Sequence, residues 1–301
     1  MRKLLSLVMT LTLLSSMAVT GAFAPRLASA QDVGDTVTIN DVDGNEIGLV
    51  TLEDLVDPFE DFDQDPERGL RFISLELTIE NTGDDPITIT PQNIGIVDDG
   101  GLIYVDVSVN RTDDIESIEA MDLEPGEEIT GGLEIGLPEE SEITQIIWLV
   151  GTGQLPTLYR DLEPVAEGDE VSLNNADYEE EAVFIAEEVV DEYDDLNEDV
   201  VLNEGFKFVG VTVTIENTGE EDFVPEPEFI FLATTDGIFW AQDASLVRSD
   251  DAIDEVPDLT DDPIAPGDSV TGFVGFGTPD TAEIDYVFYL PSDSTRLIHL
   301  Y

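Results

Sequence analysis

Carboxylates at alternate positions of one acidic segment are the side chains best suited to hold a metal ion. Asp61, Asp63 and Asp65 are followed by Glu67. Alternate side chains of a curved loop converge, and Ca²⁺ prefers such oxygen ligands. The segment departs from the EF-hand loop, because Pro66 stands where that loop has glycine. The spacing predicts a calcium site of roughly millimolar affinity, although in so acidic a chain such runs also arise from composition alone.

The sequence offers little for catalysis. It has no cysteine and one histidine, His299, on the last predicted strand. Thiol catalysis and histidine-held zinc or copper are therefore excluded, and we interpret His299 as a packed or exposed strand residue rather than part of a Ser/His/Asp relay. A carboxylate-dependent hydrolase stays open as a weak alternative, but abundant acids do not make a tuned pair. We expect no enzyme and no cofactor.

The first thirty residues predict a secretory signal peptide. Arg2 and Lys3 precede an apolar stretch over residues 4–19, and Ala28-Ser29-Ala30 provides a cleavage site after Ala30. No second apolar stretch follows, and we therefore expect no membrane insertion. We therefore expect a secreted protein, located outside the cell or in the cell envelope.

The remaining chain is strongly acidic. It keeps all 70 acidic residues and seven of the ten basic ones, which gives a net charge of −63. Nucleic acid and anionic membrane surfaces would repel such a chain. Two interpretations stay open: a hydration shell suited to a salty medium, or a surface that collects cations or a basic partner.

A repeated strand organises the fold. Residues 78–83 read Thr-Ile-Glu-Asn-Thr-Gly, and residues 214–219 repeat these six. Apolar residues at 73, 75, 77 and 79, and again at 209, 211, 213 and 215, alternate with polar ones, which indicates a strand with one face in a core. Asn-Thr-Gly then predicts a turn in which Gly83 and Gly219 supply a positive φ.

The repeat extends over most of the chain and predicts two domains after the signal peptide at 1–30, namely 31–163 and 164–301, joined near residues 162–165. Each has about seven short strands between turn signals. Residues 179–190 fit a helix or a strand, and we favour a strand; the last strand is expected near 158–162 and 297–301. The fold class is therefore all-β: two tandem immunoglobulin-like antiparallel β-sandwich domains. The following aromatic residues are predicted to pack in or near the cores: Tyr104, Trp148, Trp240, Tyr289.

A family resemblance rests on the turn and strand motifs. Leu77–Gly83 is followed by Leu123-Glu124-Pro125-Gly126-Glu127, and Val213–Gly219 by Ile264-Ala265-Pro266-Gly267-Asp268. This pattern resembles a bacterial family of unknown function, with telokin-like immunoglobulin-fold domains in secreted proteins and lipoproteins. The resemblance covers about residues 32–162 and 165–301, implies two tandem copies of that fold, and carries no catalytic residues. Many members are lipid-anchored through a cysteine, which this chain lacks.

Together these features predict a secreted, non-catalytic binding or interaction module with an acidic surface. Its ligand, a protein or a small molecule, is not identified by the sequence. The alternative is a divalent-cation (calcium) binding or structural envelope protein in which the acidic loops are the working part.

Overall fold

The structure is a computed structural model. It describes residues 32–40, 45–64, 66, 68–105, 111–148, 157–175, 178–197, 200, 204–235, 239–243, 246–292 and 295–301. The predicted signal peptide therefore lies outside the described residues. Within them, no helix is long and apolar enough to cross a bilayer.

Strands dominate both halves of the chain. The first half contains β1 (Thr36–Asn40), β2 (Glu46–Val56), β3 (Leu70–Asn81), β4 (Ile87–Ile89), the 3₁₀ turn η1 (Pro91–Asn93), β5 (Ile94–Asp98), β6 (Ile103–Val105), β7 (Met121–Leu123), β8 (Glu128–Pro138), β9 (Ile143–Trp148) and β10 (Thr157–Arg160). The second half contains β11 (Glu170–Asn174), β12 (Glu180–Asp191), β13 (Phe206–Asn217), η2 (Pro227–Phe229), β14 (Ile230–Thr234), β15 (Phe239–Trp240), α1 (Asp250–Glu255), β16 (Ser269–Pro279), β17 (Ile284–Tyr289) and β18 (Ile298–His299).

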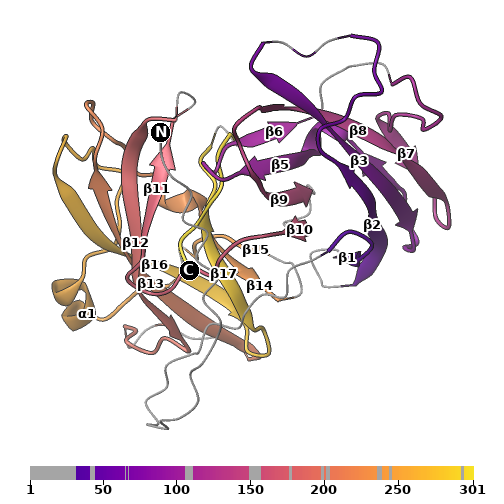
Figure 1. The fold of residues 1–301 in the computed structure, drawn as a ribbon. Coiled ribbons are helices and arrows are strands. Elements are labelled where there is room, and N and C mark those ends of the chain that lie inside the picture. The colour runs from indigo at the N-terminus through magenta and orange to yellow at the C-terminus, as the bar shows by residue number, and fades with distance from the viewer. Residues whose placement is uncertain are drawn as a thin grey trace, which may run out of the picture.

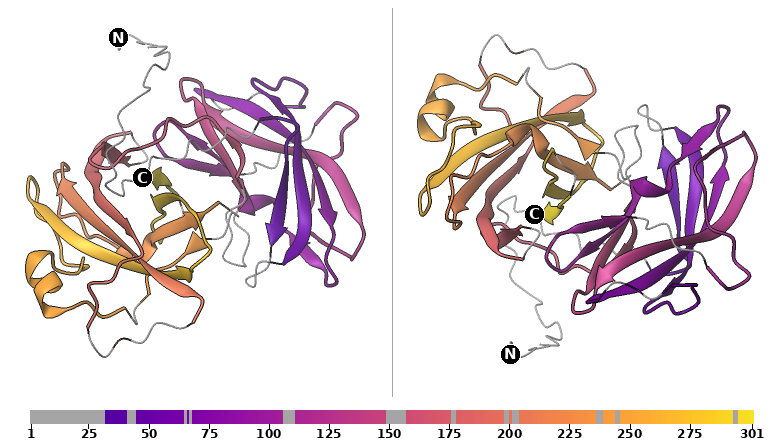
Figure 2. Two further views of the ribbon diagram at one scale, coloured as in Figure 1. Left: turned by 90° about the horizontal axis from the view of Figure 1, so that it is seen from below. Right: turned by 90° about the horizontal axis from the view of Figure 1, so that it is seen from above.

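Each half is a sandwich of two four-stranded antiparallel sheets. The outer sheets have the orders β1-β2-β3-β8 and β11-β12-β13-β16, and the inner sheets have the orders β10-β9-β5-β6 and β15-β14-β17-β18. Figure 1 shows the halves as two lobes, indigo to magenta and salmon to yellow, and Figure 2 shows them side by side from two further directions. The prediction of an all-β fold built from antiparallel sandwiches is confirmed.

The central strands β3 and β13 follow the predicted alternation. Their inward side chains are fully buried in two separate cores: Ile73, Leu75, Leu77 and Ile79 in the first half, and Val209, Val211, Val213 and Ile215 in the second. Each core also takes apolar residues from its inner sheet. Trp148 and Tyr289 are buried in these cores, while Tyr104 and Trp240 pack against them half-buried.

The asparagine of each Asn-Thr-Gly forms the same set of hydrogen bonds at the end of its central strand, an arrangement that we call an amide clip. The Nδ2 of Asn81 donates to the carbonyl oxygens of Asp85 (2.9 Å) and Leu123 (2.7 Å), and its Oδ1 accepts from the Gly83 N–H at 2.9 Å. Asn217 makes the same three bonds in the second half. Both amides are fully buried. The clip thus joins the strand end, its turn and the segment after the variable loop.

The prediction that Gly83 and Gly219 adopt a positive φ is wrong. The positive-φ glycines of this motif are instead Gly126 and Gly267, in the Pro-Gly turns. Gly83 is needed for close approach, because a Cβ there would lie 3.2 Å from the Cα and the carbonyl oxygen of Ile47. The Gly83 N–H donates to that same carbonyl at 2.9 Å, so the missing side chain permits the hydrogen bond.

A few elements differ from expectation. Residues 180–191 form strand β12, as favoured, but the variable loop of the second half holds one turn of helix, α1, in which the side chain of Ser249 accepts from the Ala252 N–H. The last strands also pair differently. Thr157 lies opposite Ile147, and His299 opposite Phe288. Thr157 and His299 are therefore equivalent, and the expected match of 158–162 with 297–301 is displaced by three residues.

Both faces of each inner sheet are buried. One face enters its own core, and the other contributes to a third apolar cluster shared by the two halves: Val97, Ile147, Ala233, Tyr286, Phe288, Leu290, Leu297. Fully burying one Phe-sized side chain contributes about 1.5–3 kcal/mol. The halves are therefore held together by an apolar layer between their inner sheets.

We predict that Asn81→Ala lowers the free energy of unfolding by at least about 2 kcal/mol, because each buried polar group left without its partner costs about 1–3 kcal/mol. Urea unfolding followed by tryptophan fluorescence measures this change. Thr82→Ala is the control: it removes only an exposed bond from Thr82 Oγ1 to Glu46 Oε1, and should change stability by less than about 0.5 kcal/mol. Equal losses in the two variants would contradict the role given to the amide.

Candidate functional site

The acidic segment predicted to bind calcium is only partly described. Asp61 and Asp63 are exposed on the loop after β2, whereas Asp65 and Glu67 lie outside the described residues. The Asp61 carbonyl oxygen accepts from the Thr112 N–H at 2.9 Å, which joins this loop to the segment before β7. Among the described residues, no group of three or more acidic or histidine side chains is arranged to hold a metal ion. The four-residue calcium site therefore stays a prediction.

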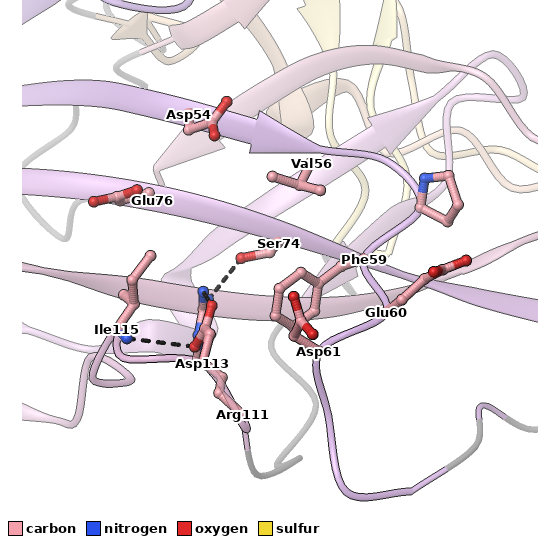
Figure 3. A pocket seen from close by; sticks show the side chains of 11 residues that line it. Asp54, Val56, Phe59, Glu60, Asp61, Ser74, Glu76, Arg111, Asp113 and Ile115 are labelled. Atoms are coloured by element: carbon pink, nitrogen blue, oxygen red, sulfur yellow. Dashed lines mark hydrogen bonds and ion pairs between the residues drawn. The ribbon is translucent and has the colours of Figure 1, made fainter.

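Asp61 does line a pocket on the outer sheet of the first half. The pocket has a volume of about 410 Å³ and is formed by the ends of β2 and β3, the loop after β2 and the loop at 111–115. Its lining residues are Asp54, Val56, Pro58, Phe59, Glu60, Asp61, Ser74, Glu76, Arg111, Asp113 and Ile115. Figure 3 shows Asp54 and Glu76 on neighbouring strands, and Asp61 next to Phe59.

Arg111 is the basic residue of this pocket, and its guanidinium is almost fully buried. It donates to Ser74 Oγ at 2.7 Å, to Glu134 Oε1 at 2.6 Å, and through Nε to Asp113 Oδ1 at 2.9 Å. Its Cζ also lies 4.7 Å from the ring centre of Phe59. The guanidinium thus pins the loop at 111–115 onto strands β3 and β8.

The ion pairs of Arg111 set its charge state and that of Asp113. Burial alone would lower the pKa of Arg111, but its hydrogen bonds to Asp113 and Glu134 outweigh burial and raise the pKa. The hydrogen bond from Arg111 lowers the pKa of the Asp113 carboxyl. Arg111 is therefore a fixed cation, and Asp113 beside it is a fixed anion.

The remaining acids give the pocket its negative charge. Asp54, Glu60, Asp61 and Glu76 line it, and none of them belongs to an ion pair between described residues. Arg111 cannot offset them, since Asp113 and Glu134 already neutralise it. Carboxylates around a concave surface attract cations and repel anions. The pocket is thus suited to a positively charged group.

The equivalent position in the second half is built differently. Ser74 and Glu134 are register partners in the first half, and glycines 210 and 275 are partners in the second. The Cβ atoms missing from these glycines would lie 2.6 Å from the Phe273 ring and 2.5 Å from the Leu246 side chain. Arg248 lies over the Phe273 ring at 4.1 Å and donates to Asp258 Oδ1 at 2.9 Å. Apolar side chains here fill the space above the outer sheet.

The sequence analysis missed these two arginines. A usable signal existed, because Arg248 lies 137 positions after Arg111, close to the 136-residue offset of the central strands. In a chain with so few basic residues, two of them at matching positions indicate a structural function in both halves.

His299 is packed between the halves. Its Nε2 lies 3.0 Å from the Gln145 Oε1, and its ring centre lies 4.4 Å from that of Tyr286. Burial, and to a smaller extent the positive charge of Arg160, together lower the pKa of His299 to about 3. The imidazole is therefore neutral over the ordinary pH range. This surrounding fits the interpretation of His299 as a packed strand residue.

One comparison with known proteins finds a similarity in the second half of the chain. A family model described as Domain of unknown function (DUF4352) matches residues 165–293, within the second half. No curated protein matches the chain. The family match agrees with the expected resemblance to a family of unknown function for this part of the chain.

Two solved structures from Bacillus are similar in part. A candidate lipoprotein of Bacillus subtilis subsp. subtilis str. 168 has 16% identity and a TM-score of 0.33, over 44% of this chain and 38% of that one. A conserved hypothetical protein of Bacillus anthracis has 18% identity and a TM-score of 0.31, over 43% of this chain and 96% of that one. The similarity thus spans well under half of the length of the Bacillus subtilis protein.

We predict that Arg111→Met lowers the free energy of unfolding by about 3–5 kcal/mol, because the buried Glu134 would lose its counter-ion. Urea unfolding measures the loss. Adding Glu134→Leu to Arg111→Met should recover part of it, since the second change removes the unpaired charge. Arg68→Met, at an exposed position, is the control and should cost less than about 0.5 kcal/mol. No recovery in the double variant would contradict the ion-pair explanation.

A second prediction concerns pH. A histidine whose pKa is lowered in the folded protein takes up its proton in the unfolded chain first as the pH falls. The contribution of His299 to the free energy of unfolding is therefore complete above about pH 6.5 and declines as the pH falls toward about 3. Between pH 6 and 4, the wild type should lose up to about 1.4 kcal/mol per pH unit relative to His299→Gln. Urea titrations of both proteins at each pH isolate this term, because the carboxylates are common to both. Parallel pH profiles would contradict it.

Proposed function

We propose that this protein is an exported, non-catalytic binding module that takes a positively charged ligand in the pocket of its first half. The observation that carries the proposal is the lining of that pocket: four carboxylates lie around it, while its arginine is neutralised by its own partners. A lysine or arginine side chain of a protein, or a small cationic molecule, has the matching charge. This choice commits to the second interpretation of the acidic surface.

The setting of the pocket supports a rigid binding site. Its strand residues Asp54 and Glu76 lie directly opposite each other in the register of β2 and β3. The loop residues are fixed by Arg111 and by the bond between Asp61 and Thr112. Binding that needs no reordering of side chains or loops avoids the entropy cost of fixing them.

Export and fold complete the proposal. The N-terminal sequence supports cleavage after Ala30 and a location outside the cell or in its envelope. The boundaries 31–163 and 164–301 are proposed as two tandem copies of one telokin-like immunoglobulin fold, supported by equal strand orders in the outer sheets. The family motifs lie in strands and turns and provide no nucleophile or acid–base pair, which supports a non-catalytic module.

Calcium is the second candidate ligand, with Asp61, Asp63, Asp65 and Glu67 as its ligands and a calcium-binding or structural envelope function. The alternating acids and the exposure of Asp61 and Asp63 support it. The two candidates share Asp61 but differ elsewhere. Asp54 and Glu76 line the pocket, whereas Asp63 is not among its lining residues.

Isothermal titration at fixed ionic strength separates the two ligands. Tetralysine should bind the mature chain, and Glu76→Gln should weaken this binding about 2- to 5-fold, as expected for loss of one partly exposed charge pair. Calcium binding, if Asp61–Glu67 form a site, should be lost in Asp63→Asn and kept in Glu76→Gln.

The control is Glu188→Gln. Glu188 occupies in β12 the place that Asp54 has in β2, as the matching register shifts of the two strands show. It should leave tetralysine binding unchanged, because the second half has apolar side chains in the place of the pocket. No heat with tetralysine, or equal weakening by Glu76→Gln and Glu188→Gln, would contradict the proposed pocket function.

A further inference from the structure

The surface between the two halves is built from equivalent positions of both inner sheets. The registers align β5 with β14 and β9 with β17, since Ile94 faces Trp148 as Ile230 faces Tyr289. The residues that point away from the two cores then form matched pairs: Val97 with Ala233, Ile103 with Phe239, Gln145 with Tyr286, Ile147 with Phe288, Thr157 with His299. Each half therefore presents the same face to the other.

These matched residues meet at the boundary. Val97, Ala233, Ile147 and Phe288 belong to the shared apolar cluster, and Ile103 and Phe239 pack against it. Phe231, Phe239 and Phe288 form mutual ring contacts, with the Phe231 and Phe288 ring centres 5.3 Å apart. The boundary is therefore a continuous apolar layer drawn from both sheets.

The polar contacts in this layer are reciprocal. Gln145 of the first half lies 3.0 Å from His299 of the second. Their equivalents, Tyr286 of the second half and Thr157 of the first, also face each other, since the Thr157 side chain lowers the pKa of the Tyr286 hydroxyl against the larger effect of burial. When residue i contacts j in one direction and j contacts i in the other, the interface is isologous, as in a two-fold symmetric dimer.

Charge is absent from the matched positions. None of the ten residues is Asp, Glu, Lys or Arg, in a chain where these four types make up 27% of the residues. The halves 31–163 and 164–301 carry net charges of −30 and −33, from 34 acids with four bases and 36 acids with three. Two such bodies repel each other at a distance, so their contact depends on a face cleared of carboxylates.

Ion pairs and hydrogen bonds at the margin close the boundary. Arg160 of the first half pairs with Asp285 of the second at 3.2 Å, and its Cζ lies 4.5 Å from the Tyr286 ring centre. On another side, the Tyr178 hydroxyl donates to Asp98 Oδ2 at 2.5 Å and lies 2.8 Å from Ser141 Oγ. An arginine of the first half and a tyrosine hydroxyl of the second thus each bind a carboxylate of the other half.

We infer that the inner face of each half is a self-complementary interaction surface whose fitting partner is a domain of the same fold, so that the chain is an intramolecular pseudo-dimer. The covalent joint at 162–165 then sets the local concentration of the partner but is not needed for recognition. The inference is independent of the acidic pocket, which lies on the outer sheet of the first half.

Cutting the joint in the folded, full-length mature protein tests this inference. A specific protease site is inserted between Glu163 and Pro164, which are both exposed. After cleavage, the two fragments should co-elute in gel filtration at micromolar concentration, with the volume of the uncut chain. Separation of the wild-type fragments would overturn the inference.

Variants of the face identify it as the surface responsible. Phe288→Asp in the cleavable chain should separate the fragments after cleavage, and Val224→Asp, at an exposed position of the same half, should not. Circular dichroism of the uncut variants checks folding. If Phe288→Asp prevents folding, Ile103→Asp at the half-buried margin of the layer takes its place. Fragments that stay together with a folded face variant would overturn the inference.

The isologous character has its own test. Gln145→Ala removes the contact with His299, together with a bond from Gln145 Nε2 to Thr157 Oγ1 inside the first half, and Tyr286→Phe removes the hydroxyl that faces Thr157. Each should raise the dissociation constant of the cleaved fragments about 2- to 12-fold, the range for one hydrogen bond. An effect from one variant and none from the other would refute the reciprocal arrangement.

Discussion

The structure depends on how residues 31–301, which carry a net charge of −63, use their seven basic residues. Six of them are buried or half-buried and pair with carboxylates: Arg71, Arg111, Arg160, Lys207, Arg248, Arg296. Arg71 and Lys207 are equivalent: Arg71 pairs with Asp57 and donates to the Ser141 carbonyl, as Lys207 does with Asp191 and the Ala282 carbonyl. The cations thus fix loops to sheets, and the unpaired acids are left for the surface.

This placement of charge separates two kinds of surface. The outer sheet of the first half has carboxylates around a pocket, and the arginine that lines this pocket is neutralised by its own ion pairs. The inner sheets carry no charge at their ten matched positions and pack against each other. In the second half, glycines 210 and 275 leave space at the equivalent position, and the side chains of Phe273 and Leu246 occupy that space. One architecture therefore forms an acidic pocket on one side and a domain-pairing face on the other.

The fold was largely predictable, because alternation at 73–79 and 209–215 reports one buried face directly. The inner face was harder to predict. Residues 143–148 read Ile-Thr-Gln-Ile-Ile-Trp, and such a run, buried on both sides, does not reveal which apolar residues face a second domain. The pocket was missed because Arg111 and Glu134 are 23 positions apart and meet only through the pairing of β3 with β8. The positive φ predicted for the glycine of Asn-Thr-Gly was wrong, because glycine is preferred both at a positive φ and where two backbone segments approach closely, and the sequence does not distinguish these two requirements.

The placement of the basic residues has a consequence for digestion by proteases. Proteases of the trypsin type cleave after lysine and arginine, and they need the chain on both sides of the cut to be accessible. In the part of the chain that the structure describes, six of the seven basic residues beyond position 30 are held in ion pairs and at least half-buried, and Arg68 is the exposed one. The basic side chains that hold the loops and halves in place are therefore also poorly accessible to proteases of this type.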